Sequence, residues 1–368
     1  MSTDLSRVIE AIRAIERGEI VVVTDDDDRE NEGDLIMAAS LATPEKIAFI
    51  IRHTSGILCT PLTREEARRL HLEPMVADND APMGTAFTVT VDYRHGLTTG
   101  ISAAERCDTV RALSNPNCGA GDFVRPGHIF PLIAKDGGVL IRSGHTEAAV
   151  DLCRLAGLSP VGVICELVND DGTVKRGPQV EAFAREHDLK LVSVADLIAY
   201  RQRKEHLVER VDSFSVETFA GPATAISYST PWDQMQHLAI VFGDIRDGRG
   251  VPVRLQLESV IDDVFGRNGG LRAVMERIAK GGRGVVVYLR EGSTGVAGSA
   301  SMRPRETQAE DHGSAQARQD QWREIGLGAQ ILKDLGITSI RLLASRERRY
   351  VGISGFDIEI EATEILDG

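Results

Sequence analysis

Residues 21–35 read VVVTDDDDRENEGDL, and this stretch decides how the first half of the chain is organised. The three valines predict a buried strand, because β-branched apolar residues favour strands. Seven carboxylates and one arginine follow, so the strand is expected to leave the core at a strongly acidic end. Like charges at this density repel one another unless a cation gathers them. The stretch therefore has two interpretations: a solvated acidic loop, or a site for a hard cation such as Mg²⁺ or Mn²⁺.

Three features of the stretch favour the cation site. The carboxylates follow a strand end directly, Arg29 lies among them, and Gly33 is expected to allow a tight turn. Other acidic motifs fit poorly. A calcium-binding helix-loop-helix with Gly33 at its sixth position needs glutamate at its twelfth, where the chain has Ala39. An Asp-x-Asp phosphatase motif needs a hydroxyl after the acidic pair, and Glu30 stands there instead.

Composition excludes several classes of protein. The 368-residue chain has a net charge of −13, which argues against a general nucleic-acid binder, and 42% of its residues are hydrophobic, enough for ordinary cores. No run approaches the ~18 apolar residues of a membrane helix, and the N-terminal residues form an amphipathic pattern without a signal-peptide core. Five cysteines, an odd number, indicate reduced thiols. We expect a cytoplasmic protein with no membrane or nucleic-acid partner.

Helical and strand patterns alternate along residues 1–205, which predicts an α/β or mixed α+β domain. Thr43, Thr63 and Ser102 are expected to cap helices. Residues 139–141 are expected to form a strand, and residues 201–210 a charged helical connector. In residues 206–368, strands are expected at 237–244, 251–257, 284–289, 339–344 and 356–362, helices at 269–280 and 328–335, and a long polar loop at 291–321.

The turn at residues 142–146, RSGHT, stands directly before a predicted helix. Arg142 brings a permanent charge, and the backbone amides at a helix start attract anions. The turn therefore suits a phosphate group, although an ordinary capped helix explains the same residues equally well. His145 can reach a metal shared with Glu30 if the two segments adjoin.

Glu166 and His128 are candidate acid/base residues. Glu166 interrupts the apolar run VGVICELV at residues 161–168, and burial there would raise its proton affinity. An exposed strand face is the alternative interpretation. His128 lies in RPGHIFPL at residues 125–132, where a core histidine is the default interpretation.

The run DRENEGD after a strand closely resembles the 3,4-dihydroxy-2-butanone 4-phosphate synthases. Further segments carry the same resemblance: RHTSGILC (Arg52–Cys59), GLTTGISAAER (Gly96–Arg106), RPGHIFPL (Arg125–Leu132) and GGVLIRSGHTEAAVDL (Gly137–Leu152). The resemblance covers about the first 200 residues and implies the fold of this family for a domain of residues 1–205.

This resemblance implies a lyase of riboflavin biosynthesis that converts D-ribulose 5-phosphate to L-3,4-dihydroxy-2-butanone 4-phosphate and formate. It implies Mg²⁺ or Mn²⁺, two ions per site, with Glu30 and His145 as metal ligands, and a homodimer with the site near the subunit boundary. Glu166 and His128 are the implied catalytic residues, and the carboxylates Glu32 and Asp34 are expected to shuttle protons. The expected substrate-binding residues are Arg29, Glu30, Asp34, Arg142, Ser143, Gly144, His145, Thr146 and Glu166.

A weaker resemblance covers the second half of the chain. HLAIVFGD (237–244), DDVFG (262–266), GGRGVVVYLREG (281–292) and GLGAQILKDLGITSIRLLA (326–344) resemble GTP cyclohydrolase II, which implies an α/β domain of that kind over residues 206–368.

The second resemblance fails where its chemistry resides. The resembled family binds zinc through three cysteines, but no cysteine follows Cys165 in this chain. Gln321 stands where the family has an aspartate, and His237 and His312 alone cannot rebuild a three-ligand site. We therefore expect a domain that binds no zinc and does not open GTP.

Three functions compete at this point. The first is a monofunctional lyase with a silent second domain, and the second is a bifunctional enzyme that also hydrolyses GTP. The third is a sugar-phosphate-responsive binding or scaffold protein whose acidic loop only collects metal. The missing cysteines count against the second function. The acid/base candidates Asp34, His145 and Glu166 count against the third, which needs no such groups.

Overall fold

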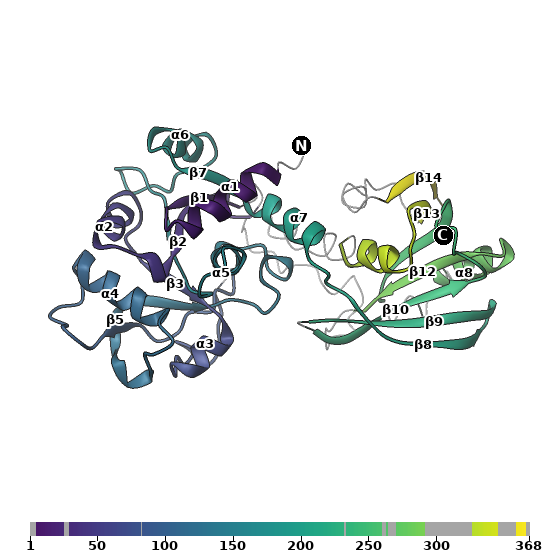
Figure 1. Ribbon diagram of the computed structural model, residues 1–368, viewed down its shortest axis with the longest axis horizontal. Helices are drawn as coiled ribbons and strands as arrows, with labels where there is room; N and C mark the ends of the chain where they lie inside the picture. Colours follow the sequence, from purple (N-terminus) through teal and green to yellow (C-terminus); the bar gives the residue numbers. More distant parts are fainter. Residues whose placement is uncertain are drawn as a thin grey trace. The chain divides into compact units, whose positions relative to one another are not determined.

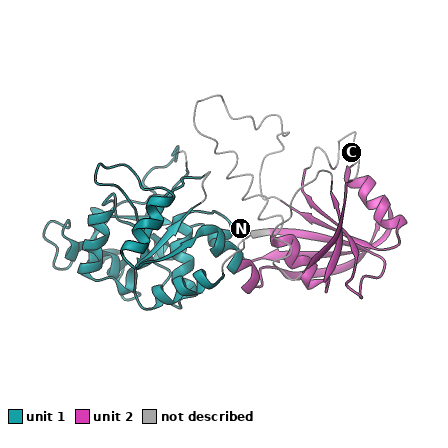
Figure 2. Cartoon of the chain, turned by 90° about the horizontal axis from the view of Figure 1, so that it is seen from above, with its two compact units in different colours: residues 1–200 teal, residues 201–368 magenta. Residues whose placement is uncertain are grey.

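Two seven-stranded sheets organise the chain, one in each of its two units, residues 1–200 and residues 201–368 (Figure 2). The computed structural model describes residues 5–25, 29–81, 83–231, 233–259, 263, 270–290, 326–344 and 358–365. The expected class, two successive domains of mixed α/β structure, is confirmed. None of the described helices is long and apolar enough to cross a membrane.

The sheet of the first unit has the order β4-β5-β3-β6-β2-β1-β7 and mixes parallel with antiparallel pairs. Its strands are β1 (Val21–Thr24), β2 (Gly33–Ala38), β3 (Cys59–Leu62), β4 (Val91–Tyr93), β5 (Phe123–Ile133), β6 (Gly162–Glu166) and β7 (Lys190–Ser193). The valines of β1 are fully buried, as the sequence predicts. The strand leads into the acidic stretch, in which residues 26–28 lie outside the described residues.

Helices cover both faces of this sheet (Figure 1). Apolar residues of α2, α4 and α6 join one core with alternate residues of the central strands, and α5 packs against β1, β2, β3 and β6. The helices are α1 (Leu5–Glu16), α2 (Pro44–His53), α3 (Arg64–Arg69), α4 (Ala103–Leu113), α5 (His145–Leu155), α6 (Pro178–Glu186) and α7 (Val194–Lys204), with short 3-10 turns at Ala39–Leu41, Ala120–Asp122 and Gly138–Leu140. Thr43, Thr63 and Ser102 cap α2, α3 and α4 as expected, each accepting from an amide three residues on.

The register of the central strands positions two site candidates. Asp34 on β2 stands opposite Val23 on β1 and opposite Glu166 on β6, and both pairs are antiparallel. Residues directly opposite in an antiparallel pair project from the same face of the sheet. Asp34 and Glu166 are therefore neighbours at one end of β2 and β6, although 132 positions separate them in the sequence.

The sheet of the second unit has the order β14-β13-β11-β12-β10-β9-β8, parallel from β14 to β12 and antiparallel from β12 to β8. α8 (Gly270–Lys280) packs on one face, and a helix over residues 326–334 reaches Leu255. The strands are β8 (Glu209–Thr218), β9 (Gly221–Thr230), β10 (Asp233–Phe242), β11 (Val251–Leu257), β12 (Gly284–Leu289), β13 (Ser339–Ala344) and β14 (Glu359–Ile365).

Several local expectations were wrong. Gly33 does not form a tight turn: it begins β2, and a Cβ atom there would lie 2.5 Å from a methyl carbon of Val180, so glycine is needed for close packing. Residues 139–141 do not form a strand, because Gly137 and Gly138 adopt positive φ and turn the chain into a 3-10 turn. The connector at 201–210 is only partly helical, since α7 ends at Lys204 and β8 begins at Glu209. The predicted loop at 291–321 lies outside the described residues.

Candidate metal and substrate site

Asp25 organises the chain after β1. Its buried carboxylate accepts from Arg29 Nη1 at 2.8 Å and from the amides of Glu30 and Glu32 at 3.0 and 2.9 Å. These three bonds draw the chain around one carboxylate, so that Glu30 turns toward the core. No signal in the sequence separates Asp25 from the three aspartates that follow it.

Glu30, Asp34 and His145 form the centre of the site. His145 Nδ1 lies 3.7 Å from Glu30 Oε2 and 3.7 Å from Asp34 Oδ1. His145 is the first residue of α5, whose packing on β2 brings the helix start to the end of β1. Ligand atoms of Asp25, Glu30 and His145 lie within 4.8 Å of one another, and among the described residues no other three His, Cys, Asp or Glu side chains do so.

Two buried atoms in this group, Asp34 Oδ1 and His145 Nε2, have no hydrogen-bond partner among the described residues. Buried polar atoms are almost always paired, so two unpaired atoms in one cluster indicate a place for a ligand. Carboxylate oxygens with an imidazole nitrogen suit Mg²⁺ or Mn²⁺. The residues present therefore fit a divalent ion.

The proton affinities of the cluster agree with a cation site. Burial alone would raise the pKa of Glu30, but His145 and Arg29 outweigh burial and lower the pKa to about 2, so this ligand is ionised. Burial alone would lower the pKa of His145, but the carboxylates of Asp34 and Glu30 raise it. Burial raises the pKa of Asp34, His145 opposes this rise, and the carboxylates of Glu166 and Glu30 raise the pKa further. Asp34 and His145 thus bind protons more tightly than usual, and a divalent cation would compete with those protons for the same carboxylate and imidazole atoms.

Two arginines converge on Gly144 at the start of α5. A Cβ atom on Gly144 would lie 2.6 Å from Arg142 Nη1, 3.0 Å from Glu147 Oε2 and 3.1 Å from Arg29 Nη2, so both guanidinium groups lie close to this backbone. Arg142 donates to the buried carboxylate of Glu147 at 2.7 Å, a partner that the sequence did not predict. Two cations beside a helix start give this turn the environment of an anion site. Ser143 and Thr146 are buried in the same turn.

Glu166 is not enclosed in an apolar strand, as its sequence context predicted. It is the last residue of β6 and is partly exposed, because the register with β2 places it at the end of the sheet. Ser55 holds it twice: Ser55 Oγ donates to Glu166 Oε2 at 2.8 Å, and the Ser55 amide donates to the Glu166 carbonyl at 2.9 Å. The carboxylate stands beside Asp34 and is open to a substrate.

His128 and Glu32 are not in contact with the central cluster. β3 lies between β5 and β6, with Cys59 facing Phe130 on one side and Ile164 on the other. His128 on β5 is thus two strand spacings from Glu166, about 10 Å between backbones. Glu32 Oε1 accepts a hydrogen bond from the exposed Arg176 at 3.3 Å.

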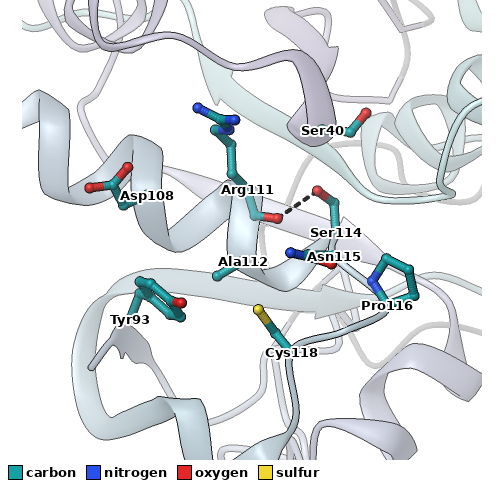
Figure 3. A pocket seen from close by; sticks show the side chains of 9 residues that line it. All are labelled: Ser40, Tyr93, Asp108, Arg111, Ala112, Ser114, Asn115, Pro116 and Cys118. Carbon is teal, nitrogen blue, oxygen red and sulfur yellow. Dashed lines mark hydrogen bonds between the residues drawn. The ribbon is translucent and has the colours of Figure 1, made fainter. Parts of the chain in front are cut away.

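A cavity of about 480 Å³ in the first unit holds none of the predicted site residues (Figure 3). It lies along α4 and the loop after it, and its lining includes Tyr93, Asp108, Arg111 and Cys118. The carboxylate and histidine cluster carries the chemistry instead, because it brings together the possible metal ligands Asp25, Glu30 and His145, none of which lines this cavity.

The second unit places polar residues at the carboxyl ends of β11 and β12. Asp263 accepts from Tyr288 Oη at 2.7 Å, from the Ser259 amide at 2.9 Å and from Gln256 Nε2 at 3.1 Å. Glu258 accepts from Arg290 Nε at 3.2 Å. The described carboxylates at these strand ends are therefore hydrogen-bonded to protein groups. No cysteine follows Cys165 in the chain, so these strand ends do not resemble a thiolate zinc site.

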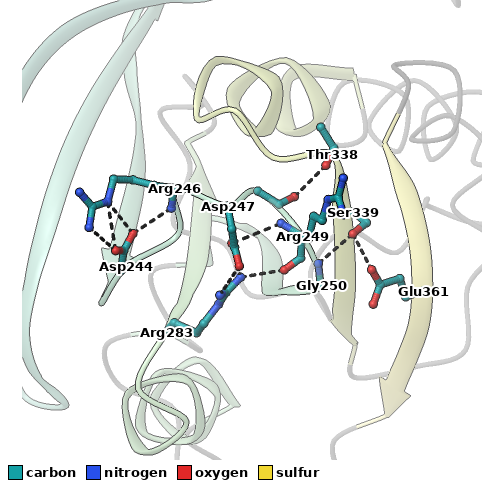
Figure 4. Close-up of polar contacts among 10 residues, drawn as sticks. Asp244, Arg246, Asp247, Arg249, Gly250, Arg283, Thr338, Ser339 and Glu361 are labelled. Carbon is teal, nitrogen blue, oxygen red and sulfur yellow. Dashed lines mark hydrogen bonds and ion pairs between the residues drawn. The ribbon is translucent and has the colours of Figure 1, made fainter.

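The opposite ends of the same strands are also tied together (Figure 4). Arg283 donates to Asp247 at 2.7 Å and to the Arg249 carbonyl at 2.7 Å, and the Gly250 amide donates to Ser339 Oγ at 2.8 Å. These bonds join the 243–250 loop to the starts of β12 and β13. They are structural, since each of these groups has a protein partner.

Comparison with known proteins identifies both halves of the chain. Residues 9–200 match the family model described as 3,4-dihydroxy-2-butanone 4-phosphate synthase, and residues 209–365 match that of GTP cyclohydrolase II. The chain is 46% identical over 96% of its length to "Bifunctional riboflavin biosynthesis protein RIBA 1, chloroplastic" of Arabidopsis thaliana, and covers 68% of that protein. It is 46% identical over 97% of its length to "Riboflavin biosynthesis protein RibBA" of Salinispora arenicola, of which it covers 88%.

Two solved structures are similar. RibBX of A. baumannii, described as a two domain 3,4-dihydroxy-2-butanone 4-phosphate synthase, has a TM-score of 0.79 and 38% identity over 98% of this chain and 99% of its own. A 3,4-dihydroxy-2-butanone 4-phosphate synthase in complex with two magnesium ions has a TM-score of 0.52 and 46% identity over 54% of this chain and 97% of its own. The name of the Arabidopsis relative favours the bifunctional alternative over a silent second domain, whereas RibBX is described as a synthase with two domains.

Proposed function

This chain belongs to the 3,4-dihydroxy-2-butanone 4-phosphate synthase family, and from that membership we propose that it converts D-ribulose 5-phosphate to L-3,4-dihydroxy-2-butanone 4-phosphate and formate in riboflavin biosynthesis, with Mg²⁺ as cofactor. The observation that carries the proposal is the buried cluster of Glu30, Asp34 and His145, with two unpaired polar atoms beside two arginines. A metal-collecting scaffold would need no acid/base group next to this cluster, and Glu166 stands there.

Glu30 and His145 hold the ion in this proposal, and bound Mg²⁺ supplies Lewis-acid stabilisation of negative charge on adjacent substrate oxygens. Glu30 suits the role because it is ionised, and His145 because Nε2 is unpaired. The ion count of two follows the magnesium complex of the similar synthase. Asp25 holds the loop in place and has its oxygens engaged by Arg29 and backbone amides.

The substrate phosphate lies at the start of α5, between Arg29 and Arg142, with the amides of Ser143, His145 and Thr146 as further donors, since the Gly144 amide already donates to the Arg142 carbonyl. This placement sets the carbon skeleton of the sugar across the ends of β2 and β6. Glu166 then accepts and returns a proton, since it is partly exposed and positioned by Ser55. Asp34 and Glu32 remain candidate proton shuttles, and His128 acts at the far side of the site.

The second unit is catalytically silent toward GTP in our proposal. The relatives named as bifunctional keep the alternative open, but the chemistry of the chain opposes it. A zinc site of thiolates needs cysteine, and the chain has none after Cys165. Glu258 and Asp263, which stand at the corresponding strand ends, are engaged by Arg290, Tyr288 and Gln256.

Metal removal tests the lyase proposal. The full-length protein is stripped with a chelator and supplied with ribulose 5-phosphate, and formate is measured before and after Mg²⁺ is restored. Activity is expected only with the added ion. Formate release at the full rate from protein without measurable metal would overturn the proposal.

The homodimer with its site near the subunit boundary and the cytoplasmic location also remain proposals. Light scattering on the active protein measures the first, and a fully active monomer at assay concentration would exclude it.

A further inference from the structure

Residues 125–128, Arg-Pro-Gly-His, form a bulge between β4 and β5. Val91 faces Ile129 and the next residue, Asp92, faces Val124, so the four residues between them on β5 have no partner on β4. A Cβ atom on Gly127 would lie 2.0 Å from the backbone of Val91, so only glycine allows the bulge to lie this close to β4. Bulges of this kind redirect a side chain, and here the side chain is that of His128.

β4 and the residue before it hold the bulge by two side chains. Thr90 Oγ1 accepts from the Gly127 amide at 3.0 Å, and Asp92 Oδ1 accepts from the His128 amide at 2.8 Å. The second oxygen of Asp92 lies 2.7 Å from His128 Nδ1. One carboxylate therefore fixes both the backbone and the ring of the same histidine.

The exposure of the two partners is unequal. The Asp92 side chain is 4% exposed, whereas the His128 side chain is 43% exposed. Because a carboxylate can only accept, His128 Nδ1 carries the proton of this bond. Nε2, at the other side of the ring, is then the nitrogen available for proton exchange.

Gly100 encloses the same pair from a third segment of the chain. A Cβ atom on Gly100 would lie 2.2 Å from Asp92 Oδ2 and 2.7 Å from His128 Nδ1, and the residue has a φ of +79°. The backbone at Gly100 therefore lies so close to the Asp92–His128 hydrogen bond that no side chain fits between them. Such close enclosure limits water around Nδ1 and keeps the bond intact.

We propose that Asp92 is the positioning residue of His128. It fixes the ring and the Nδ1–H tautomer, so that His128 Nε2 can exchange a proton with the substrate. This inference rests on the proposed lyase function and adds to it a residue that touches no substrate. Asp92 acts through His128 alone.

The same unit offers a matched control. His95 Nε2 lies 2.9 Å from Asp122 Oδ1, a histidine–aspartate bond of similar length. Both partners of this second pair are substantially exposed, at 61% and 34%, and they lie on the surface. If the loss of any histidine–aspartate hydrogen bond lowered activity, breaking the His95–Asp122 bond would lower it as much as breaking the His128–Asp92 bond.

The test compares Asp92→Asn with Asp122→Asn in full-length protein with Mg²⁺ and ribulose 5-phosphate. Asparagine in place of Asp92 keeps the volume and can still accept from the His128 amide, but it presents NH₂ to the ring and so favours the wrong tautomer. We expect kcat to fall about 100-fold or more while KM stays within about threefold, and Asp122→Asn to leave both unchanged. Adding Asp92→Asn to His128→Gln should cost less than about twofold more. A full kcat in Asp92→Asn, or multiplicative losses in the double variant, would overturn the proposal.

A measurement on the unmodified protein covers the case in which Asp92→Asn fails to fold. Long-range ¹H–¹⁵N spectra of the histidine rings, with His128 assigned by its loss in His128→Gln, report the tautomer directly. Nδ1–H is expected, and Nε2–H would contradict the role of Asp92. The two proposals fail separately: without any formate from the unmodified protein the lyase function is wrong, whereas an active Asp92→Asn removes only the positioning role.

Discussion

The strand ends of the two units carry similar residues, but their polar side chains differ in hydrogen bonding. In the first unit, carboxylates follow β1 and begin β2, and two buried atoms, Asp34 Oδ1 and His145 Nε2, have no hydrogen-bond partner in the part of the chain that the structure describes. In the second unit, the carboxylate of Asp263 follows β11 and binds Tyr288, Gln256 and a backbone amide. Among the described residues, the first end leaves Asp34 Oδ1 and His145 Nε2 without a hydrogen-bond partner, whereas the carboxylates of Glu258 and Asp263 at the second end accept hydrogen bonds from protein groups.

Unpaired buried polar atoms distinguish a ligand-binding strand end from a purely structural one better than the types of residue present do. Both ends contain acidic residues, arginine and a nearby histidine, so composition alone would treat them alike. An unpaired buried polar atom costs about 1–3 kcal/mol, a cost that persists only where a ligand or a function offsets it. Substitutions at both ends test whether they differ in this way.

The largest effect is expected from removing a metal ligand. Glu30→Gln should lower lyase activity more than about 100-fold, because even residues that only orient metal ligands cost roughly 10- to 100-fold. Asp263→Asn, the matched change in the second unit, should leave that activity within about twofold. Steady-state formate release measures the activity of both variants. Equal losses would contradict the claim that only the strand end of the first unit serves the lyase reaction.

Glu166→Gln comes next. It keeps the shape of the side chain and removes its proton transfer, so kcat should fall roughly 100-fold while the unfolding midpoint is retained. Glu186→Gln, on the exposed side of α6, serves as the control and should change nothing. If kcat falls less than about tenfold, Glu166 holds the end of β6 in place and does not take part in proton transfer.

Arg142→Ala should weaken phosphate binding by roughly 1.5–3 kcal/mol, which raises KM roughly 10- to 100-fold. It also leaves the buried Glu147 without its charged partner, so unfolding must be followed in parallel. Arg64→Ala is a suitable control, because that arginine is exposed on α3. An unchanged KM with unchanged kcat would remove Arg142 from the substrate site.

The smallest effect should arise in the second unit. Tyr288→Phe removes the hydroxyl that Asp263 accepts from, and unfolding of the second unit should be easier by about 1 kcal/mol. Lyase activity should be unaffected. If zinc raised the unfolding midpoint of the unmodified protein and Tyr288→Phe abolished that shift, the strand end would be a metal site after all.

The sequence predicted what depends on local pattern. The valines of β1 and the caps at Thr43, Thr63 and Ser102 follow from neighbouring residues, and the structure confirms them. The turn at 142–146 was expected to precede the helix, and α5 begins inside it, at His145. The approach of His145 to Glu30 followed only from family resemblance. No spacing rule places residues on different elements side by side.

What the sequence missed depends on distant partners. Gly33 looked like a turn residue, but glycine is needed there because Val180, far along the chain, packs directly against its backbone. The sequence left open whether Glu166 is buried or exposed, and the register of β2 with β6 places it, partly exposed, at the end of the sheet. Asp25 and Asp92 carried no distinguishing mark, since their roles arise from the hydrogen bonds they accept in the folded chain.

The contrast between the two units is tested most directly by formate release from two substrates with one preparation of full-length protein. We predict one formate for each ribulose 5-phosphate consumed with Mg²⁺, and none from GTP with Zn²⁺. Formate from GTP, together with stoichiometric zinc on the protein, would contradict the claim that the second unit is silent and would establish a bifunctional enzyme.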